Sequence, residues 1–406
     1  MPEVTILQVV PRLDAGGSEQ AAVEIAQALA SAGASALVAT EGGRLATAIA
    51  DAGGEILPLP VASKNPLTIL ANARQLAQLI EERGVDLVHA RSRAPAWSAF
   101  IAARRTGRPF VTTYHGAYGN PGAVKRVYNS VMGRGDRVIA NSNYTARLIA
   151  SRHPAAKARI RTIHRGVDAD AFEARAVPPE AVAKLRERWG VAPETKIVLQ
   201  AARLTGLKGH RDTIEAAFFL ATESALDGAV VIFAGDAPGK SAYREDLAAL
   251  IARHGLDDKV RLVGHCEEMP AAFLAAEVAL VPSLVPETFG RTSIEAQAMG
   301  CPVIVSDIGA LPETVVAPEE DKAGFTGWLV KPGDPSALAA KIKRALNLAP
   351  DARAALGVRA RARVASQYTL RAMQQATLAV YDELLGTSLA ARFGQSAKAT
   401  PSQTSR

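Results

Sequence analysis

Cysteine is scarce in this chain, which has 406 residues but only two cysteines, Cys266 and Cys301. The low count excludes a disulfide framework, and the two positions do not have the spacing of a zinc site. The seven histidines are scattered without an H-x3-H pair, so the sequence predicts no dedicated zinc site. We expect both thiols to be buried as small apolar side chains.

Long apolar runs are also missing from the chain. No stretch approaches the roughly 18 residues that a membrane-spanning helix needs. The first ten residues have the pattern of a short strand and lack the basic start and the long apolar region of a signal peptide. The sequence therefore predicts a protein of the cytoplasm that does not cross the membrane.

The abundant residues are aliphatic, since 48% of the chain is hydrophobic although only 5% is aromatic. This composition suits α/β layers, and the length suits two domains rather than one core. Apolar runs of strand length alternate with alanine-rich helical stretches, which predicts βαβ units and parallel sheets in both halves. The predicted strands are 4–10, 36–40, 55–59, 85–89, 110–114, 137–140, 160–164, 196–201, 229–234, 260–263, 278–281, 302–306 and 326–330.

Breaks in this alternation predict the domain limits. Segments 177–179 and 192–194 flank a single helical stretch, so we place the interdomain link there. The first domain would then comprise residues 1–175 and the second residues 190–365. Residues 387–406 lack periodicity and are rich in Ser, Thr, Ala and Lys, so we expect a disordered tail.

The most chemically specific segment is PETFGRTSIEAQAMGCPVIVSD, in which Glu287 and Glu295 lie on either side of a Phe-Gly turn. Apolar and small residues at helical spacing predict a helix that begins near Arg291 and ends at Gly300, followed by a buried strand. Free amides at the helix start, beside Gly290, form an anion site suited to a diphosphate. The carboxylate of Glu295 can then accept hydrogen bonds from the hydroxyls of a ribose.

Paired carboxylates also hydrolyse glycosides, which is an alternative interpretation of Glu287 and Glu295. The two carboxyl groups of such enzymes lie roughly 5 to 9.5 Å apart. Eight residues of helix span about 12 Å, so the spacing argues against a hydrolytic pair. A second alternative is that both glutamates are solvated acids at a helix end.

This segment resembles the E-x7-E signature of the family 4 retaining glycosyltransferases. Three further motifs are similar to that family and follow its order: GGSE at 16–19, TYHG at 113–116 and ARLTGLKGH at 202–210, each after a predicted strand. The resemblance extends from Val4 to about Leu385. It implies the GT-B fold, with two Rossmann-like domains facing across a cleft, and a helix at 371–385 that returns to pack on the first domain.

The resemblance also implies roles for individual residues. Arg203 and Lys208 bind the donor diphosphate and stabilise the leaving group, so that no metal ion and no cofactor is required. His115 contacts the transferred sugar, and these three residues together with Glu287 form the predicted catalytic set. The predicted donor-binding residues are Gly16, Gly17, Arg203, Lys208, Cys266, Glu268, Glu287, Phe289, Gly290, Arg291 and Glu295.

Taken singly, these features have ordinary structural explanations. A glycine pair after a strand is typical of a generic turn, loop cations are usually solvated, and a lone histidine is usually structural. Asp168 and Asp170 spell D-x-D, which binds manganese in another glycosyltransferase class, but here they match the N-G-V-D loop segment of family 4. Arg165 stands where that family usually has Asn, which adds a cation.

Positive charge is concentrated in the first half of the chain. Residues 91–165 contain fifteen Lys and Arg but a single acid, Asp136, for a charge of +14, whereas the rest of the chain has 32 basic and 39 acidic residues. Such a concentration favours a polyanionic partner. No helix-turn-helix, RRM or zinc-finger pattern accompanies it, which argues against nucleic acid. We expect a basic N-terminal domain that meets the inner-membrane surface or an anionic glycolipid acceptor.

These features predict a retaining, metal-independent glycosyltransferase of the hexosyl or heptosyl type, which moves a sugar from a nucleotide-diphosphate sugar to a membrane-linked glycan or glycolipid. The resemblance implies front-side attack, with the departing phosphate taking the acceptor's proton. Residues 92–119 are similar to enzymes that extend the lipopolysaccharide core, which predicts cell-envelope biosynthesis by a peripheral protein on the inner face of the cytoplasmic membrane. Alternatives are phospholipid (inositol-type) mannosylation, capsule or exopolysaccharide assembly, a nucleotide-sugar epimerase and a non-catalytic nucleotide-sugar binding protein.

Overall fold

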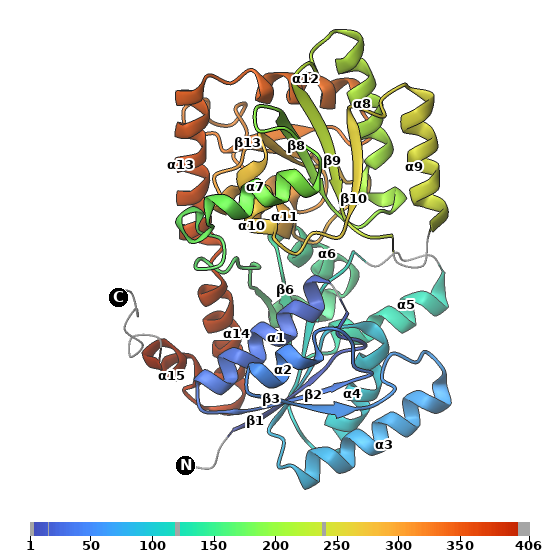
Figure 1. The fold of residues 1–406 in the computed structure, drawn as a ribbon. Helices are drawn as coiled ribbons and strands as arrows, with labels where there is room; N and C mark the ends of the chain where they lie inside the picture. The colour runs from blue at the N-terminus through green and yellow to red at the C-terminus, as the bar shows by residue number, and fades with distance from the viewer. Residues whose placement is uncertain (1–3, 15, 118–121, 238–240, 397–406) are drawn as a thin grey trace. The chain divides into compact units, whose positions relative to one another are not determined.

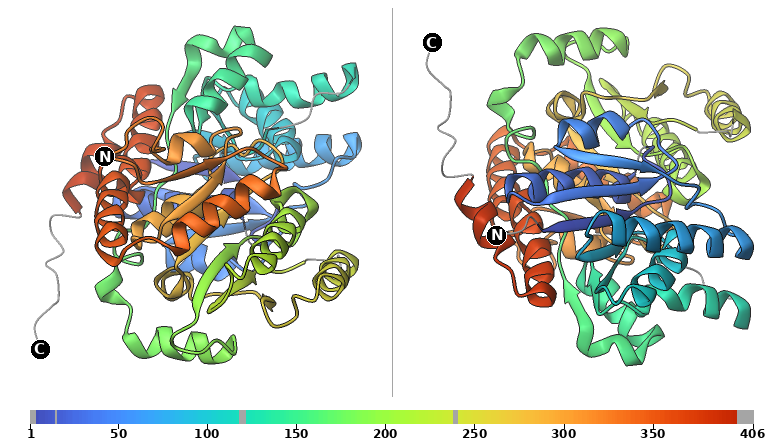
Figure 2. Two further views of the ribbon diagram at one scale, coloured as in Figure 1. Left: turned by 90° about the horizontal axis from the view of Figure 1, so that it is seen from above. Right: turned by 90° about the horizontal axis from the view of Figure 1, so that it is seen from below.

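Two compact units make up the chain in the computed structural model, which describes residues 4–14, 16–117, 122–237 and 241–396 (Figure 1). The N-terminal unit extends to Arg165 and resumes at Leu370, and the C-terminal unit runs from Gly166 to Thr369. Each unit is built on one parallel sheet, of seven strands in the first and six in the second. Figure 2 shows helices on both faces of each sheet, and this confirms the predicted pair of Rossmann-like domains.

The sheet of the N-terminal unit has the strand order β3-β2-β1-β4-β5-β6-β7, and the order reverses direction between β1 and β4. Its strands read as nearly continuous apolar runs because both faces of a parallel sheet are covered by helices. Each strand predicted in this half has an observed counterpart. The strands are β1 Thr5–Val9, β2 Ser35–Thr40, β3 Gly54–Pro58, β4 Leu87–Ala90, β5 Phe110–Tyr114, β6 Arg137–Ala140 and β7 Ile160–Thr162.

Helices cover this sheet on two sides. Leu29 of α1 and Leu378 of α14 are buried in the cluster on one face, and Leu76 of α3 and Ala99 of α4 in the cluster on the other. The helices are α1 Gly17–Ser31, α2 Ala46–Asp51, α3 Pro66–Glu82, α4 Arg93–Arg105, α5 Ala123–Ser130, α6 Asn143–Arg152, α14 Leu370–Leu385 and α15 Leu389–Ser396, with 3₁₀ turns η1 Val131–Gly133 and η2 Pro154–Arg159.

The sheet of the C-terminal unit has the order β10-β9-β8-β11-β12-β13, which reverses between β8 and β11. Its strands are β8 Lys196–Ala201, β9 Ala229–Ala234, β10 Val260–Gly264, β11 Val278–Val281, β12 Val303–Ser306 and β13 Gly327–Val330, again matching the prediction. The helices are α7 Pro179–Arg188, α8 His210–Thr222, α9 Ser241–Arg253, α10 Met269–Ala275, α11 Arg291–Ala298, α12 Pro335–Leu346 and α13 Pro350–Gln367, with 3₁₀ turns η3 Ala174–Ala176, η4 Gly206–Lys208 and η5 Leu311–Thr314.

The predicted interdomain link at 177–194 is wrong, because the units divide at Arg165 and Gly166 and again at Thr369 and Leu370. Helix α7, which was expected to bridge the domains, belongs to the C-terminal unit. Its Leu185 and the following Trp189 are buried in one cluster with Phe273 of α10. The proline-containing segments on either side of α7 suggested a linker, but the burial of Leu185 and Trp189 in this cluster places the helix in the C-terminal unit.

The predicted disordered tail at 387–406 also needs correction. Residues Leu389–Ser396 form helix α15, with Leu389 and Phe393 buried in the same cluster as α1 and α14. Asp382 accepts hydrogen bonds from the backbone amides of Leu389 and Ala390, at 2.6 and 2.9 Å, and so caps the new helix. Residues 397–406 lie outside the part of the chain that the structure describes.

Helix α14 is the helix that was expected to return to the first domain, and buried polar contacts fix its position there. The hydroxyl of Tyr381 lies 2.7 Å from Nδ1 of His89, whose Nε2 lies 2.7 Å from Oγ1 of Thr113. Gln374 donates to the carbonyl of Glu24 on α1 at 2.7 Å. Burial raises the pKa of Tyr381 to about 12 and lowers the pKa of His89 well below its usual value, so both groups are neutral at pH 7.

Replacing Tyr381 by phenylalanine is expected to lower the free energy of unfolding by about 1–3 kcal/mol, because a buried nitrogen of His89 loses its hydroxyl partner. Scanning calorimetry of thermal unfolding measures the effect. The matched control is Tyr243→Phe, since the hydroxyl of Tyr243 makes no hydrogen bond to any described residue. A Tyr381→Phe protein as stable as wild type would contradict the proposed contribution of this bond.

Candidate donor site

The loop after β8 holds Lys208 in a fixed backbone position. The side-chain amide of Gln200 donates to the carbonyl of Lys208 at 2.8 Å, and Thr213 on α8 donates to Gln200 Oε1 at 2.7 Å. Gly209, next in the chain, has φ +74°, and a Cβ there would lie 2.0 Å from the carbonyl oxygen of Pro282. Only glycine fits this approach, so the Lys-Gly pair pins the loop against the segment that follows β11.

Lys208 and Glu287 form an ion pair across two neighbouring strand ends. Nζ of Lys208 lies 2.7 Å from Oε1 of Glu287, with 27% and 20% of the two side chains exposed. Ser283 also donates to this carboxylate oxygen, and the amide of Ala310 donates to the carbonyl of Glu287 at 2.9 Å. The pair lies at the carboxyl ends of β8 and β11, where the strand order reverses. Open α/β sheets bind their ligands at such a reversal.

Helix α11 begins at Arg291 as predicted, and Gly290 is its N-cap. Gly290 has φ +123°, and a Cβ on it would lie 2.6 Å from Cδ2 of Leu311. The glycine is therefore required by the backbone and by Leu311, and the predicted approach of a ligand is not needed to explain it. Glu295 lies within the helix and accepts from Nε of Arg291 at 2.7 Å, with 15% and 26% of the side chains exposed. Glu287 precedes the helix, so a helical rise does not measure its separation from Glu295.

Phe289 has a structural role that the sequence did not indicate. Its side chain is 4% exposed and packs against Tyr368 in a T-shaped contact, with ring centroids 5.6 Å apart. Tyr368 in turn donates from its hydroxyl to the carbonyl of Glu313 at 2.6 Å. The side chain of Phe289 thus anchors the turn before α11. The predicted contact of Phe289 with the donor would have to be made by its backbone.

The other residues predicted in this unit lie at neighbouring strand ends. Arg203 is exposed after β8, and among the described residues it makes no ion pair with Glu287. Cys266 follows β10 and is buried, and burial raises the pKa of its thiol. Glu268 pairs with Arg188 at 2.8 Å, and this hydrogen bond lowers the pKa of its carboxyl. The structure joins Lys208 to Glu287 by direct contact, whereas Arg203 and Glu268 face solvent.

A second cluster gathers the residues predicted in the N-terminal unit. Gly16 caps α1, and the carbonyl of Gly17 accepts from Nη2 of Arg165 at 2.7 Å. The same nitrogen of Arg165 lies 2.6 Å from Nδ1 of His115 at the end of β5. Burial, followed by the charges of Arg165 and Arg91, lowers the pKa of His115 well below its usual value. The imidazole is therefore neutral at pH 7.

Arg165 determines which nitrogen of His115 carries the proton. A guanidinium only donates, so Nδ1 of His115 accepts and the proton of the neutral ring is on Nε2. His115 thus presents an N–H donor. Sequence reasoning noticed Arg165 only as a departure from the family's Asn, because nothing local indicates that positions 115 and 165 meet.

The described ranges, residues 4–14, 16–117, 122–237 and 241–396, contain neither a metal-binding cluster nor a membrane-spanning helix. No group of three or more His, Cys, Asp and Glu residues arranged to hold a metal ion occurs there. Among the same residues no helix combines the length and the apolar character needed to cross a bilayer.

The stability of the protein is expected to depend on pH through His210, the first residue of α8. It is fully buried between Phe233 and Tyr243, and burial lowers its pKa to about 4. As the pH is lowered, the imidazole of His210 therefore takes up a proton at a higher pH in the unfolded chain than in the folded protein. The free energy of unfolding should be greatest above pH 6.5 and should decrease by about 3 kcal/mol in total as the pH falls toward 4. His210→Phe should flatten the decline in denaturation experiments, whereas substitution of the exposed His265 by glutamine should not. Equal slopes for all three proteins would contradict the assignment.

Comparison with known proteins places the fold in a class. The family model of Glycosyltransferase Family 4 matches residues 15–171, and that of Glycosyl transferases group 1 matches residues 182–363. A glycosyltransferase structure from Rickettsia africae ESF-5 is 32% identical with a TM-score of 0.84, and the match covers 96% of this chain and 100% of that one. Two Rossmann-like domains of this kind define the GT-B glycosyltransferases. The chain belongs to family 4 of these enzymes.

Other relatives differ in how much of their length is matched. The D-inositol 3-phosphate glycosyltransferase of Streptomyces avermitilis is 33% identical over 272 residues, which are 63% of this chain but 56% of that relative. The chain thus spans little more than half the length of that protein. Anabaena Alr3699/HepE, solved with UDP-glucose, has a TM-score of 0.81 at 24% identity over 94% of this chain and 100% of the other. That likeness shows the common fold.

Proposed function

We propose that this protein is a retaining, metal-independent glycosyltransferase that takes a sugar from a nucleotide-diphosphate donor to a membrane-linked glycan or glycolipid. The observation that carries the proposal is the Lys208–Glu287 pair at the strand-order reversal of the C-terminal unit. A cation and the amide-rich start of α11 at one sheet edge are the groups that a diphosphate needs. Family membership supports the same chemistry.

The residues have complementary roles in this reaction. Lys208 and Arg203 stabilise the negative charge that develops on the diphosphate as the glycosidic bond breaks. Glu295 accepts hydrogen bonds from the donor's ribose, and Glu287 keeps the ammonium of Lys208 in place. His115 donates its Nε2 proton in a hydrogen bond to a hydroxyl of the transferred sugar. The acceptor hydroxyl attacks from the leaving-group face, its proton passes to the departing phosphate, and the anomeric configuration is retained.

Two acceptor classes follow from different observations. The basic stretch 91–165 favours an anionic glycolipid at the inner face of the cytoplasmic membrane, in lipopolysaccharide core or related cell-envelope synthesis. The named activity of the Streptomyces avermitilis relative instead favours a phosphorylated inositol as acceptor. Each purified acceptor, supplied with the donor identified below, distinguishes them by mass spectrometry of the product.

The test begins with donor hydrolysis, because transferases release some donor to water. UDP-, GDP- and ADP-sugars are supplied in turn, and free nucleoside diphosphate is measured in a coupled assay. One donor should give turnover that a chelator leaves unchanged, and NMR of the released sugar should show the donor's anomeric configuration first. Thermal stabilisation by a nucleotide sugar without any turnover would instead identify a non-catalytic binding protein. Inverted configuration would exclude the retaining mechanism.

A further inference from the structure

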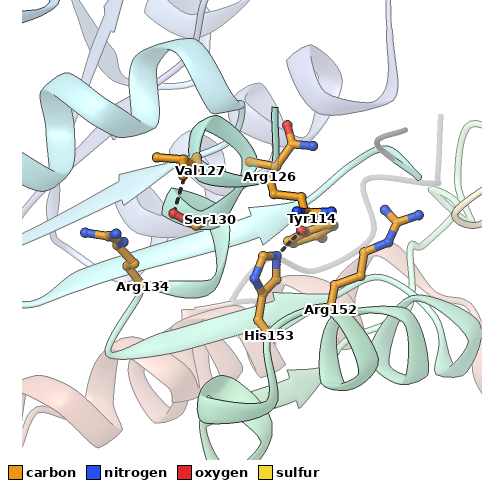
Figure 3. Close-up of a pocket in the computed structure, with 8 residues that line it drawn as sticks. Tyr114, Arg126, Val127, Ser130, Arg134, Arg152 and His153 are labelled. Atoms are coloured by element: carbon orange, nitrogen blue, oxygen red, sulfur yellow. Dashed lines mark hydrogen bonds between the residues drawn. The ribbon is translucent and has the colours of Figure 1, made fainter. Parts of the chain in front are cut away.

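A cavity of about 370 Å³ opens in the N-terminal unit beside the end of β5 (Figure 3). Tyr114, at the carboxyl end of the strand, lines it, whereas the next residue, His115, belongs to the Arg165 cluster described above. The remaining lining residues come from α5, α6 and the turns that follow them: Arg126, Val127, Asn129, Ser130, Arg134, Arg152 and His153. None of the residues that line the cavity is one assigned to the donor or to the transferred sugar.

The cavity is cationic. Three arginines line it, and none of its lining residues is acidic. Figure 3 shows Arg126 and Arg152 approaching Tyr114 from α5 and α6, with Arg134 on the other side of Ser130. A guanidinium group offers several N–H donors that match the oxygen atoms of a phosphate group.

The polar floor of the cavity is preorganised. The hydroxyl of Tyr114 lies 2.8 Å from Nε2 of His153, and burial together with the charge of Arg152 lowers the pKa of that histidine. Arg134 is held from behind, since its guanidinium lies 5.2 Å from the ring centroid of Trp97. A ligand entering here meets side chains that are already in position, which reduces the entropic cost of binding.

The rim of the cavity on α5 is both apolar and basic. Val124 and Val127, three positions apart, are 85% and 62% exposed, and Lys125 and Arg126 between them are exposed too. Residues three apart share one face of a helix. Exposed valines beside cations are typical of a surface that rests on the interface of an anionic bilayer.

We propose that this cavity binds the phosphate group of a membrane phospholipid, with Val124 and Val127 in contact with the bilayer interface. The inference deepens the proposed function and rests on its membrane-linked acceptor. A phosphate site on α5 and α6 holds the N-terminal unit against the lipid surface, where an acceptor of that kind lies. It also assigns a role to three of the fifteen basic residues in the stretch 91–165, namely Arg126, Arg134 and Arg152.

Vesicle sedimentation tests the proposal on the full-length protein. Wild type should bind vesicles of phosphatidylcholine and phosphatidylglycerol and should not bind phosphatidylcholine alone. Arg126→Gln with Arg152→Gln should weaken the partition at least about tenfold, since each basic residue near an anionic surface contributes about a factor of five. Val124→Ser with Val127→Ser should also weaken the partition into vesicles, because it removes apolar contact with the bilayer and leaves the charge unchanged.

The matched control is Arg44→Gln with Arg74→Gln, which removes the same charge from exposed sites of the same unit. If both pairs of arginine substitutions weakened vesicle binding equally, binding would depend on the overall positive charge of the unit and not on the cavity. A different result would be that inorganic phosphate stabilises wild type but not the Arg126→Gln, Arg152→Gln variant while wild type binds no vesicles. That result would overturn the assignment of the cavity to a lipid. Donor hydrolysis by wild type without vesicles is measured alongside, so a failure of the proposed transfer activity is seen independently.

Discussion

Replacing Lys208 by alanine is expected to lower donor turnover by about 10²–10³-fold, the usual effect of removing one preorganised group that stabilises developing negative charge. The backbone of Lys208 is held by hydrogen bonds through Gln200 and Thr213, and its ammonium is directed by Glu287. Alanine keeps that backbone but removes the charge. The partly exposed ion pair contributes at most about 1 kcal/mol to stability, so the fold should persist.

Release of nucleoside diphosphate under saturating donor measures this loss, with the melting temperature as the check on folding. Lys341→Ala is the matched control. The side chain of Lys341 is 24% exposed, close to the 27% of Lys208, and its ammonium pairs with Glu319 at 3.3 Å. It should turn over donor like wild type. Near wild-type turnover by the Lys208→Ala protein would mean that the donor site lies elsewhere.

Replacing Arg165 by methionine is expected to reduce kcat by about tenfold to a hundredfold, because His115 loses the donor that keeps its proton on Nε2. Arg165 is a positioning residue in this account. Burial is the main cause of the low pKa of His115, and the substitution removes the charge that lowers it most. That pKa should rise toward 6.5, so the activity of the variant should begin to fall at a higher pH than that of wild type as the pH is lowered.

The pH profile separates this effect from simple damage to the fold, since a structural defect would lower kcat equally at each pH. Nitrogen NMR of labelled His115 reports its tautomer directly and should show a mixture in the variant. Arg161→Met is the control, because Arg161 belongs to the exposed cluster around Glu383 and does not contact His115. An unchanged pH profile with an unchanged tautomer would refute the role of Arg165.

The sequence predicted most of the fold because its signals are local. Strand-length aliphatic runs and alanine-rich helices recur with little interruption, so each predicted strand was found. The two errors, at the interdomain link and at the tail, involve short helices. Nothing within α7 or α15 indicates which core will bury Trp189 or Phe393, since that depends on helices far away in the chain.

Within the candidate site, motifs identified positions but not contacts. The sequence alone determined where α11 starts, since the spacing of small and apolar residues and the Phe-Gly turn are local signals, whereas the positive φ of Gly209 and Gly290 was found only in the structure. The tertiary structure alone decided that Lys208 meets Glu287, 79 residues away, and that Arg165 meets His115, 50 residues away. Parallel strands bring such residues together at one sheet edge, and a pairing across that edge depends on strand order, which no local pattern encodes.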